Sequence, residues 1–133
     1  MKNIHILGVS SLVGFTLLLG TTVFAASANF SGNLPPNQGD TQVSTVARAS
    51  SDVKHFTISI TKLGSGNAIR AWTEGGLGDN YSDPYNQVPF SGTYNVLYYT
   101  NKIPGKGQNT TLNLDNPINT SASVPVGGNW SPN

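Results

Sequence analysis

The alternation of hydrophobic and polar residues is clearest in Val53–Leu63. Phe56, Ile58 and Ile60 share one parity, and the residues between them are polar. Successive side chains of a strand point to opposite faces, so this pattern predicts a strand with one buried face and one solvated face. A glycine-rich turn follows, and it predicts that the chain returns through Ala68–Glu74 to form a central hairpin.

Shorter stretches with the same two-residue period predict further strands. Phe90–Thr100 has apolar residues at both parities, so we expect it inside a sheet. Pro125 is expected to confine the last strand to a sheet edge, because proline cannot donate to a ladder. Residues 131–133 are expected to form a tail. The remaining strands are expected near Asn29–Leu34, Thr41–Ala49, Thr110–Asp115 and Ala122–Val126.

These segments predict the fold class. About seven short strands, with no amphipathic helical stretch after residue 28, are typical of an all-β protein. We therefore expect a small antiparallel β-sandwich, with a single small barrel as the alternative.

The N-terminal residues have the pattern of a signal peptide. Lys2 precedes the stretch Ile6–Phe24, which is apolar apart from glycine, serine and threonine. Small residues then offer cleavage after Ala25 or after Ala28, as a signal peptidase requires. The sequence therefore predicts export.

An uncleaved membrane anchor is the alternative, because the apolar run approaches the ~20 residues that span a bilayer. Glycines interrupt the run, and no Lys or Arg follows it until Arg48. Both features favour cleavage. We expect a signal peptide over residues 1–28 and a single β-sandwich domain over residues 29–133. The mature protein would be extracellular, without stable membrane insertion.

Composition narrows the function classes. The chain contains no cysteine, so disulfides and thiolate chemistry are excluded. Beyond residue 28 the six basic residues are balanced by six acidic ones that are scattered along the chain. Nucleic-acid binding requires a basic patch, which this distribution does not provide. Low net charge also permits self-association.

The longest stretch without strand periodicity, Gly75–Pro89, is where we expect a binding site. Long loops carry function more often than the scaffold does. Aromatic faces beside amide side chains hold sugars or peptides in many small binding modules. The alternative is that the tyrosine rings pack on the loop's own edge of the sandwich. The expected ligand is a cell-wall glycan or a surface protein, and the candidate residues are Asp79, Asn80, Tyr81, Asp83, Tyr85 and Asn86.

Catalytic and metal-binding patterns are weak. His55 is expected to be a solvated strand residue, and no Gly-x-Ser-x-Gly elbow accompanies it. Glu74, Asp79 and Asp83 could supply two carboxylates for glycoside hydrolysis. The stretch from Asp79 to Asp83 offers oxygen ligands for calcium but lacks the residue order of an EF-hand loop. We therefore expect no catalytic residues, no metal site and no cofactor.

Several short motifs resemble a known group of proteins. They are the leader, the start near Asn29-Phe30, and the runs Tyr94-Asn-Val-Leu-Tyr-Tyr-Thr, Thr111-Leu-Asn-Leu-Asp-Asn-Pro and Gly128-Asn-Trp-Ser-Pro-Asn. Together they are similar to a family of small secreted proteins of Gram-positive bacteria that carry a β-rich domain of unknown function. The resemblance implies an extracellular all-β protein without assigned catalysis. The resemblance assigns no functional residues to this chain.

The expected function is that of a secreted, non-enzymatic protein that acts at the bacterial cell exterior by binding or assembly. One alternative is a secreted antimicrobial, bacteriocin-like protein. A cationic amphipathic stretch would favour membrane attack, and the sequence has none. The other alternative is a small glycan-active hydrolase.

Overall fold

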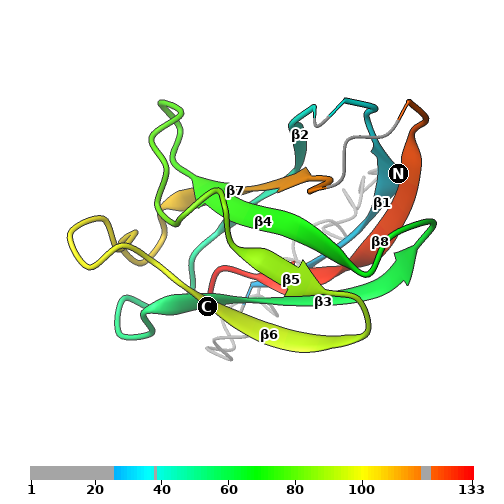
Figure 1. The fold of residues 1–133 in the computed structure, drawn as a ribbon. Coiled ribbons are helices and arrows are strands. Elements are labelled where there is room, and N and C mark those ends of the chain that lie inside the picture. Colours follow the sequence, from blue (N-terminus) through cyan, green and yellow to red (C-terminus); the bar gives the residue numbers. More distant parts are fainter. Residues whose placement is uncertain (1–25, 38, 118–120) are drawn as a thin grey trace, which may run out of the picture.

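The structure is a computed structural model that describes residues 26–37, 39–117 and 121–133. Residues 1–25 of the expected signal peptide lie outside this part. The described chain forms strands and no helix, and so contains no helix able to cross a membrane (Figure 1). The strands are β1 (Ala28–Leu34), β2 (Thr41–Ala47), β3 (His55–Leu63), β4 (Ala68–Glu74), β5 (Gln87–Pro89), β6 (Gly92–Leu97), β7 (Asn109–Asp115) and β8 (Val124–Ser131).

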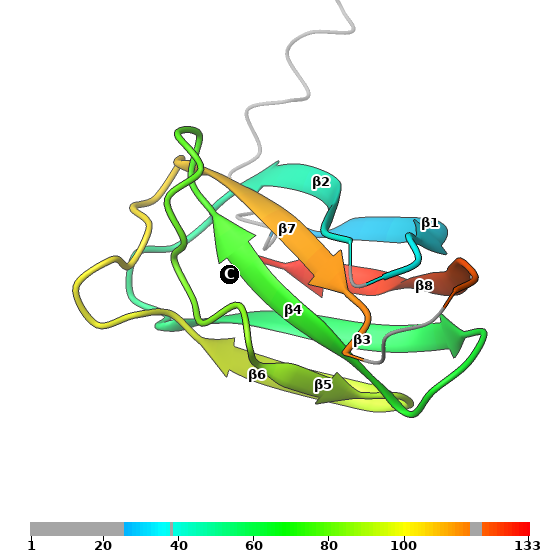
Figure 2. The same cartoon turned by 45° about the horizontal axis from the view of Figure 1, so that its top comes forward.

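Two antiparallel sheets of four strands form the molecule. One has the order β1-β8-β3-β6, and the other has the order β2-β7-β4-β5. Figure 2 shows β7 and β4 crossing in front of β8 and β3, with one layer over the other. The expected all-β sandwich is confirmed, with eight strands rather than about seven. The missed strand is the three-residue β5, too short to show a period.

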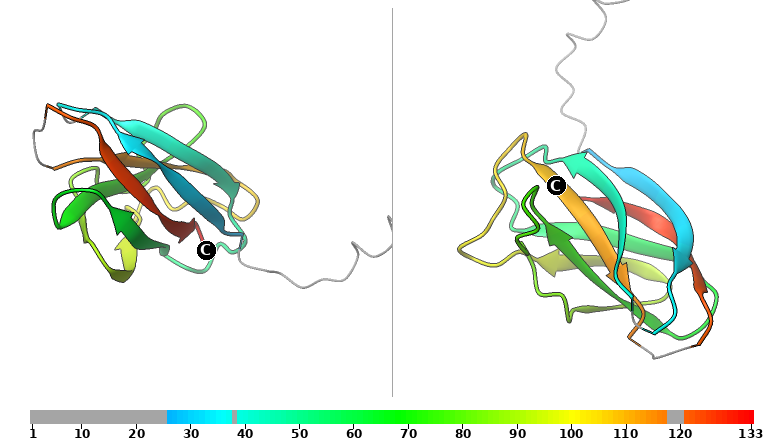
Figure 3. Two further views of the ribbon diagram at one scale, coloured as in Figure 1. Left: turned by 90° about the vertical axis from the view of Figure 1, so that its right-hand side faces the viewer. Right: turned by 90° about the horizontal axis from the view of Figure 1, so that it is seen from above.

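The strand pairing follows a simple rule. β1 pairs with β8, β2 with β7, β3 with β6, and β4 with β5. The chain is therefore a long hairpin that has rolled up, and β3 then meets β8 while β4 meets β7. This is the eight-stranded jelly-roll connectivity. At one side of the roll β1 lies next to β2, as Figure 3 shows.

The core lies between the sheets and contains the side chains that the alternation predicted. Phe56 and Ile58 of β3 are fully buried, and Ile60 is 1% exposed. Trp130 of β8 packs edge-on against Phe56, with 6.4 Å between the ring centroids. Its indole nitrogen donates to Ser44 Oγ of the facing sheet at 2.7 Å. The parity of β3 is thus confirmed, and one polar contact links the two layers.

The expected central hairpin is wrong. β3 and β4 belong to different sheets, and the turn between them carries the chain from one layer to the other. At this turn Gly64 N donates to Pro125 O, and Phe90 N donates to Asn67 O. Alternation reports which face of a strand is buried. It does not report which strand lies alongside, and here the partners are distant in sequence.

The expected positions of two other strands are also reversed. β6, expected inside a sheet, lies at an edge, and Leu97 on its outer face remains 69% exposed. β8, expected at an edge, lies between β1 and β3. Pro125 is tolerated there because it lies at the start of the strand, outside the β3–β8 ladder, which ends at the pair of Leu63 with Val126. Its carbonyl accepts the Gly64 N–H at 2.7 Å.

The expected tail at residues 131–133 is part of the fold. Ser131 is the last residue of β8, and Pro132 is buried. The carbonyl of Pro132 accepts the Tyr98 hydroxyl at 2.7 Å. The side chain of Asn133 donates to Thr57 Oγ1 at 2.8 Å. These contacts tie the last residues to β3 and to the segment after β6.

Candidate functional site

The stretch expected to be an irregular loop, residues 75–89, folds back along β4. Tyr81 N donates to Thr73 O at 2.8 Å, and Ala71 N donates to Asn86 O at 3.1 Å. Beyond Asn86 the chain continues as β5, which pairs with the first residues of β4. The segment is therefore a strand partner of β4 that is interrupted over residues 82–85. The interruption is what projects side chains over the sheet.

Tyr81 has a structural role in this segment. Its ring is half-buried against the core, and its hydroxyl accepts a hydrogen bond from Gln108. Its carbonyl accepts the N–H of Tyr99 at 2.7 Å. A Cβ added at Gly75 would overlap the phenol, so a larger residue there would displace the Tyr81 ring. The alternative of a ring packed on the sandwich edge therefore holds for Tyr81.

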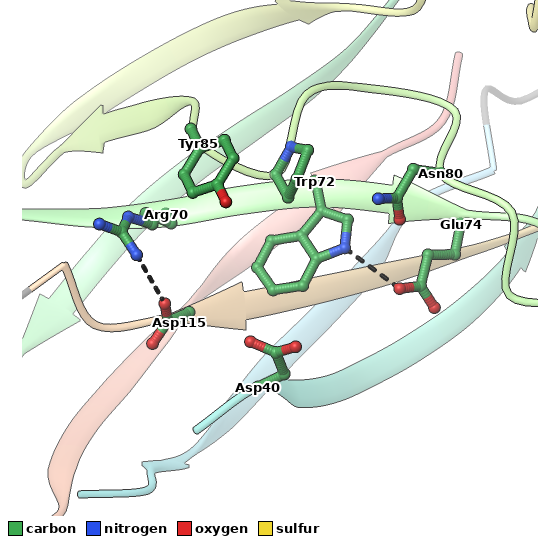
Figure 4. A pocket seen from close by; sticks show the side chains of 8 residues that line it. Asp40, Arg70, Trp72, Glu74, Asn80, Tyr85 and Asp115 are labelled. Atoms are coloured by element: carbon green, nitrogen blue, oxygen red, sulfur yellow. Dashed lines mark hydrogen bonds and ion pairs between the residues drawn. The ribbon is translucent and has the colours of Figure 1, made fainter. Parts of the chain in front are cut away.

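A hollow of about 350 Å³ lies on the outer face of the β2-β7-β4-β5 sheet. Figure 4 shows Trp72 of β4 at its centre, with Asp115 on one side and Glu74 on the other. Alternate residues of β4 face outward here, while Ile69 and Ala71 face the core. The full lining consists of Asp40, Arg70, Trp72, Glu74, Asn80, Pro84, Tyr85 and Asp115.

Tyr85 stands exposed at the rim of this hollow. Its side chain is 73% exposed, and the ring centroid lies 5.6 Å from the Arg70 guanidinium carbon. That cation–π distance is within the range in which the interaction is attractive. The backbone N–H of Tyr85 donates to Asp83 Oδ1 at 2.9 Å, forming an Asx turn. The turn orders the backbone of Tyr85, and the guanidinium lies against its ring.

Polar contacts hold the remaining walls. Arg70 Nη1 lies 3.2 Å from Asp115 Oδ2, across the register pair that joins β4 to β7. Trp72 Nε1 donates to Glu74 Oε1 at 3.2 Å, which fixes the indole plane. Gln42 of β2 donates to Glu74 Oε2 at 3.5 Å. The hollow is therefore built on three adjacent strands and is preorganised.

Asp115 has the most perturbed environment in the hollow. Its side chain is 6% exposed, Oδ2 pairs with Arg70, and the backbone of Asn116 donates a hydrogen bond to the carboxylate. Burial raises the pKa of Asp115 above its ordinary value, the Arg70 charge opposes this, and the Asp40 charge adds to it. The ionised form of Asp115 is thus less favoured in the folded protein than in water.

A pH-dependent stability follows from this environment. Because the native pKa is raised above the unfolded value of 3.8, the folded state binds the proton more tightly, and ionisation costs stability as pH rises through the native pKa. The variant Asp115→Asn has no carboxyl group to ionise at this position. We therefore expect its stability, relative to that of the wild type, to increase when the pH is raised from acidic to neutral. Urea unfolding at one acidic and one neutral pH measures this. Asp52→Asn, an exposed carboxylate outside the hollow, controls for general charge loss, and a difference independent of pH would contradict the prediction.

Of the six predicted binding residues, the structure brings only Asn80 and Tyr85 to the hollow. Asp79 Oδ1 instead lies 3.8 Å from Lys102 Nζ in an exposed pair. Asn86 lines a separate depression between β5 and β6. Asp83 accepts the Tyr85 N–H within the same segment, and the Tyr81 ring packs against the core. In the described residues, no group of three or more His, Cys, Asp or Glu side chains is arranged to hold a metal ion.

Six of the eight lining residues were not among the predicted binding residues. Glu74 was considered only as a catalytic carboxylate and Pro84 only as part of residues 75–89, and the other four were not expected at the site for two reasons. Arg70 and Trp72 share a parity with Glu74, but the mixed pattern of that strand hid which face was outward. Asp40 and Asp115 are far apart in the chain and meet because β2 pairs with β7, with Thr41 opposite Leu114. No local pattern carries that information.

Comparison with protein-family models, with curated proteins and with solved structures found no match. The jelly-roll topology is shared by proteins of many functions, so it does not decide this one. Function is therefore argued from the geometry and chemistry of the hollow.

Proposed function

We propose that the protein is exported and binds a carbohydrate of the bacterial cell exterior in this hollow, without catalysing a reaction on it. The observation that carries the proposal is the exposed Tyr85 ring, held by Arg70 at the rim of a polar hollow. An exposed aromatic ring is normally free to turn. Here the Arg70 guanidinium lies against the ring, and this contact restrains it beside polar groups, which reduces the entropy lost on binding.

The chemistry of the lining matches that of a sugar. A sugar ring has an apolar C–H face, which can stack on Tyr85, and hydroxyl groups around its edge. The carboxylates of Asp40 and Glu74, with the Asn80 amide, supply acceptors for those hydroxyls. Concave sites with a few convergent polar groups are the usual form of small-ligand sites.

Features outside the hollow support the same proposal. The leader predicts export, and the resemblance to small secreted proteins of Gram-positive bacteria supports the same location. Jelly rolls include lectin domains, so the fold supports carbohydrate binding by analogy alone.

The structure favours one of the two expected cleavage sites. Ala28 is the first residue of β1 and pairs with Trp130. Ala26 O accepts the Ser131 hydroxyl at 2.7 Å. Cleavage after Ala28 would remove both contacts, so we expect the secreted protein to begin at Ala26. N-terminal sequencing of protein from culture medium tests this, and a chain beginning at Asn29 or Met1 would refute it.

Binding should depend on Tyr85. We expect Tyr85→Ala to weaken binding to purified cell-wall polysaccharide about tenfold or more, as truncation of an aromatic anchor does. Stability should change by no more than about 0.5 kcal/mol, because the ring is mostly exposed. Co-sedimentation with the polysaccharide and urea unfolding should be measured on the same variant.

Leu77→Ala is the matched control, since Leu77 lies in the same loop and is 95% exposed but does not line the hollow. Equal binding by wild type, Tyr85→Ala and Leu77→Ala would exclude the hollow as the site. Release of reducing ends during incubation would instead identify a hydrolase. The raised pKa of Asp115 beside other carboxylates is the one feature that favours that alternative.

A further inference from the structure

The β1-β8-β3-β6 sheet ends in an open edge at β6. Among the described residues, no strand pairs with the outer side of β6. Figure 2 shows β6 and β5 along the lower side of the molecule, away from β1 and β2. The opposite side of the roll is covered, because β1 lies next to β2 there. β6 therefore presents backbone groups that a further strand could bind.

The direction of these backbone groups follows from two hydrogen bonds just after β6. Tyr98 N donates to Lys54 O, next to β3, whereas Tyr99 N points the other way and donates to Tyr81 O. Backbone groups alternate in direction along an antiparallel strand, so the even-numbered residues of β6 bond to β3 and the odd-numbered residues point outward. The outward residues are Thr93, Asn95 and Leu97.

This edge lacks the features that normally prevent edge pairing. Sheet edges are usually protected by charges, proline, bulges or short strands. β5 has three residues and ends at Pro89, and β2 has a register irregularity. β6 has six residues in unbroken register with β3, and residues 84–101 contain no charged side chain. The Asn95 side chain is directed toward β3, where its Oδ1 accepts the Thr57 hydroxyl at 3.0 Å, and so leaves the edge open.

We propose that two copies of this chain pair through β6 and form an antiparallel two-fold dimer. Asn95 lies opposite its own copy at the axis, and Thr93 lies opposite the partner's Leu97. Every outward backbone group of β6 is then paired on both subunits. On the core side, Tyr94 lies opposite the partner's Val96, and aromatic and β-branched pairs of this kind stabilise sheets.

The two neighbouring registers fit the edge less well. Shifting the pairing by two residues in one direction sets Leu97 opposite Ser91, whose φ of 67° is not that of a strand. Shifting it in the other direction sets Thr93 opposite Tyr99, whose N–H already donates to Tyr81 O. The register centred on Asn95 avoids both conflicts.

Charge favours a second copy as the occupant of this edge. A two-fold contact places a surface against itself, so a charged edge would meet its own charge. The groove between β5 and β6 has a volume of about 280 Å³ and is lined by neutral side chains only. The whole chain has a net charge of +1. Self-pairing therefore brings no like charges together.

The geometry ends the assembly at two copies. The contact uses β6 of both subunits, and the far side of each roll is covered by the approach of β1 to β2. The two-fold axis is perpendicular to the paired sheet, so both hollows face the same way. With the carbohydrate binding proposed above, the dimer would hold two sites against one polysaccharide surface. The dimer itself does not depend on that function and is tested without a sugar.

The concentration dependence of the molecular mass tests the contact. A pair of six-residue strands is smaller than a standard interface of about 800 Å² per partner, so we expect a weak dimer. Sedimentation equilibrium of the secreted protein from ~10 μM to ~1 mM should show the mass rising from monomer to dimer and no further. A protein that stays monomeric throughout, or that forms larger assemblies, overturns the inference.

Opposite charges introduced at Asn95 test the two-fold register. Asn95→Lys sets two lysines opposite each other at the axis, and Asn95→Glu sets two glutamates there. Each variant alone should dimerise about fivefold or more weakly than the wild type, because like charges directly opposite destabilise a strand pair. An equimolar mixture of the two variants should regain the dimer, since each lysine then meets a glutamate.

Thr93→Lys is the matched control on the same strand. It adds the same charge, but it lies opposite the partner's Leu97 and about 13 Å along the strand from its own copy. Its dimerisation should be weakened less than that of Asn95→Lys. Both positions are exposed, and circular dichroism establishes that each variant is folded. Equal dimerisation of Asn95→Lys and Thr93→Lys, or a mixture of the Asn95 variants that does not regain the dimer, would contradict pairing through β6 in this register.

Discussion

Gly128→Ala is expected to lower the free energy of unfolding by about 3 kcal/mol or more, the upper range for overpacking a core. Gly128 lies in β8, opposite Ile60 of β3. A Cβ at this position would overlap the carbonyl oxygen of Ser59 and lie 2.9 Å from Phe30 Cζ. The Ser59 carbonyl is backbone inside a sheet and cannot turn aside, so the β3–β8 ladder itself would have to open.

The neighbouring glycine provides the control. A Cβ at Gly127 would lie 3.4 Å from Phe30 O and 3.5 Å from Lys62 Cβ, which are ordinary contacts. We expect Gly127→Ala to change stability by less than about 1 kcal/mol. Urea unfolding followed by circular dichroism measures both variants. Equal stability of Gly128→Ala and Gly127→Ala would show that β3 and β8 are not packed as described.

Replacing Arg48 by Met is expected to cost about 3–5 kcal/mol, because several hydrogen bonds from one buried charge are lost together. Arg48 is 1% exposed and pairs with no Asp or Glu side chain in the described residues. Its Nη1 donates to Pro104 O, and its Nε donates to Pro132 O at 3.3 Å and to the Asn133 main-chain oxygen at 2.8 Å. Methionine would leave these oxygens buried and without that donor.

Arg48 also supports Tyr98, whose ring centroid is 5.0 Å from the guanidinium carbon. Burial raises the pKa of the Tyr98 phenol, and the Arg48 charge partly opposes this. Loss of Arg48 should therefore loosen the last residues first, and hydrogen exchange should detect it there before the core strands. Lys62→Met, at an exposed position of β3, is the control. Equal stability of Arg48→Met and Lys62→Met would contradict the structural role of Arg48.

Only part of the candidate site could be predicted from the sequence. Asn80 and Tyr85 were identified because an aromatic residue beside amides in a non-periodic stretch is a recognisable local pattern. Tyr81 has the same pattern but packs inward, since its backbone pairs with Thr73. Asp40 and Asp115 carry no local sign of a site at all. Their chemistry arises from being brought together and partly buried, which is a property of the fold.

Local sequence determined every strand but β5, the buried face of β3 and the all-β class, because side-chain alternation and the exclusion of apolar groups from water act along a single strand. Tertiary structure alone decided the strand order, since each ladder joins segments distant in the chain. It placed Pro125 inside a sheet and turned the last three residues into part of the fold. It also created the hollow, because pairing of β2 and β4 with β7 sets Asp40, Trp72 and Asp115 on one face.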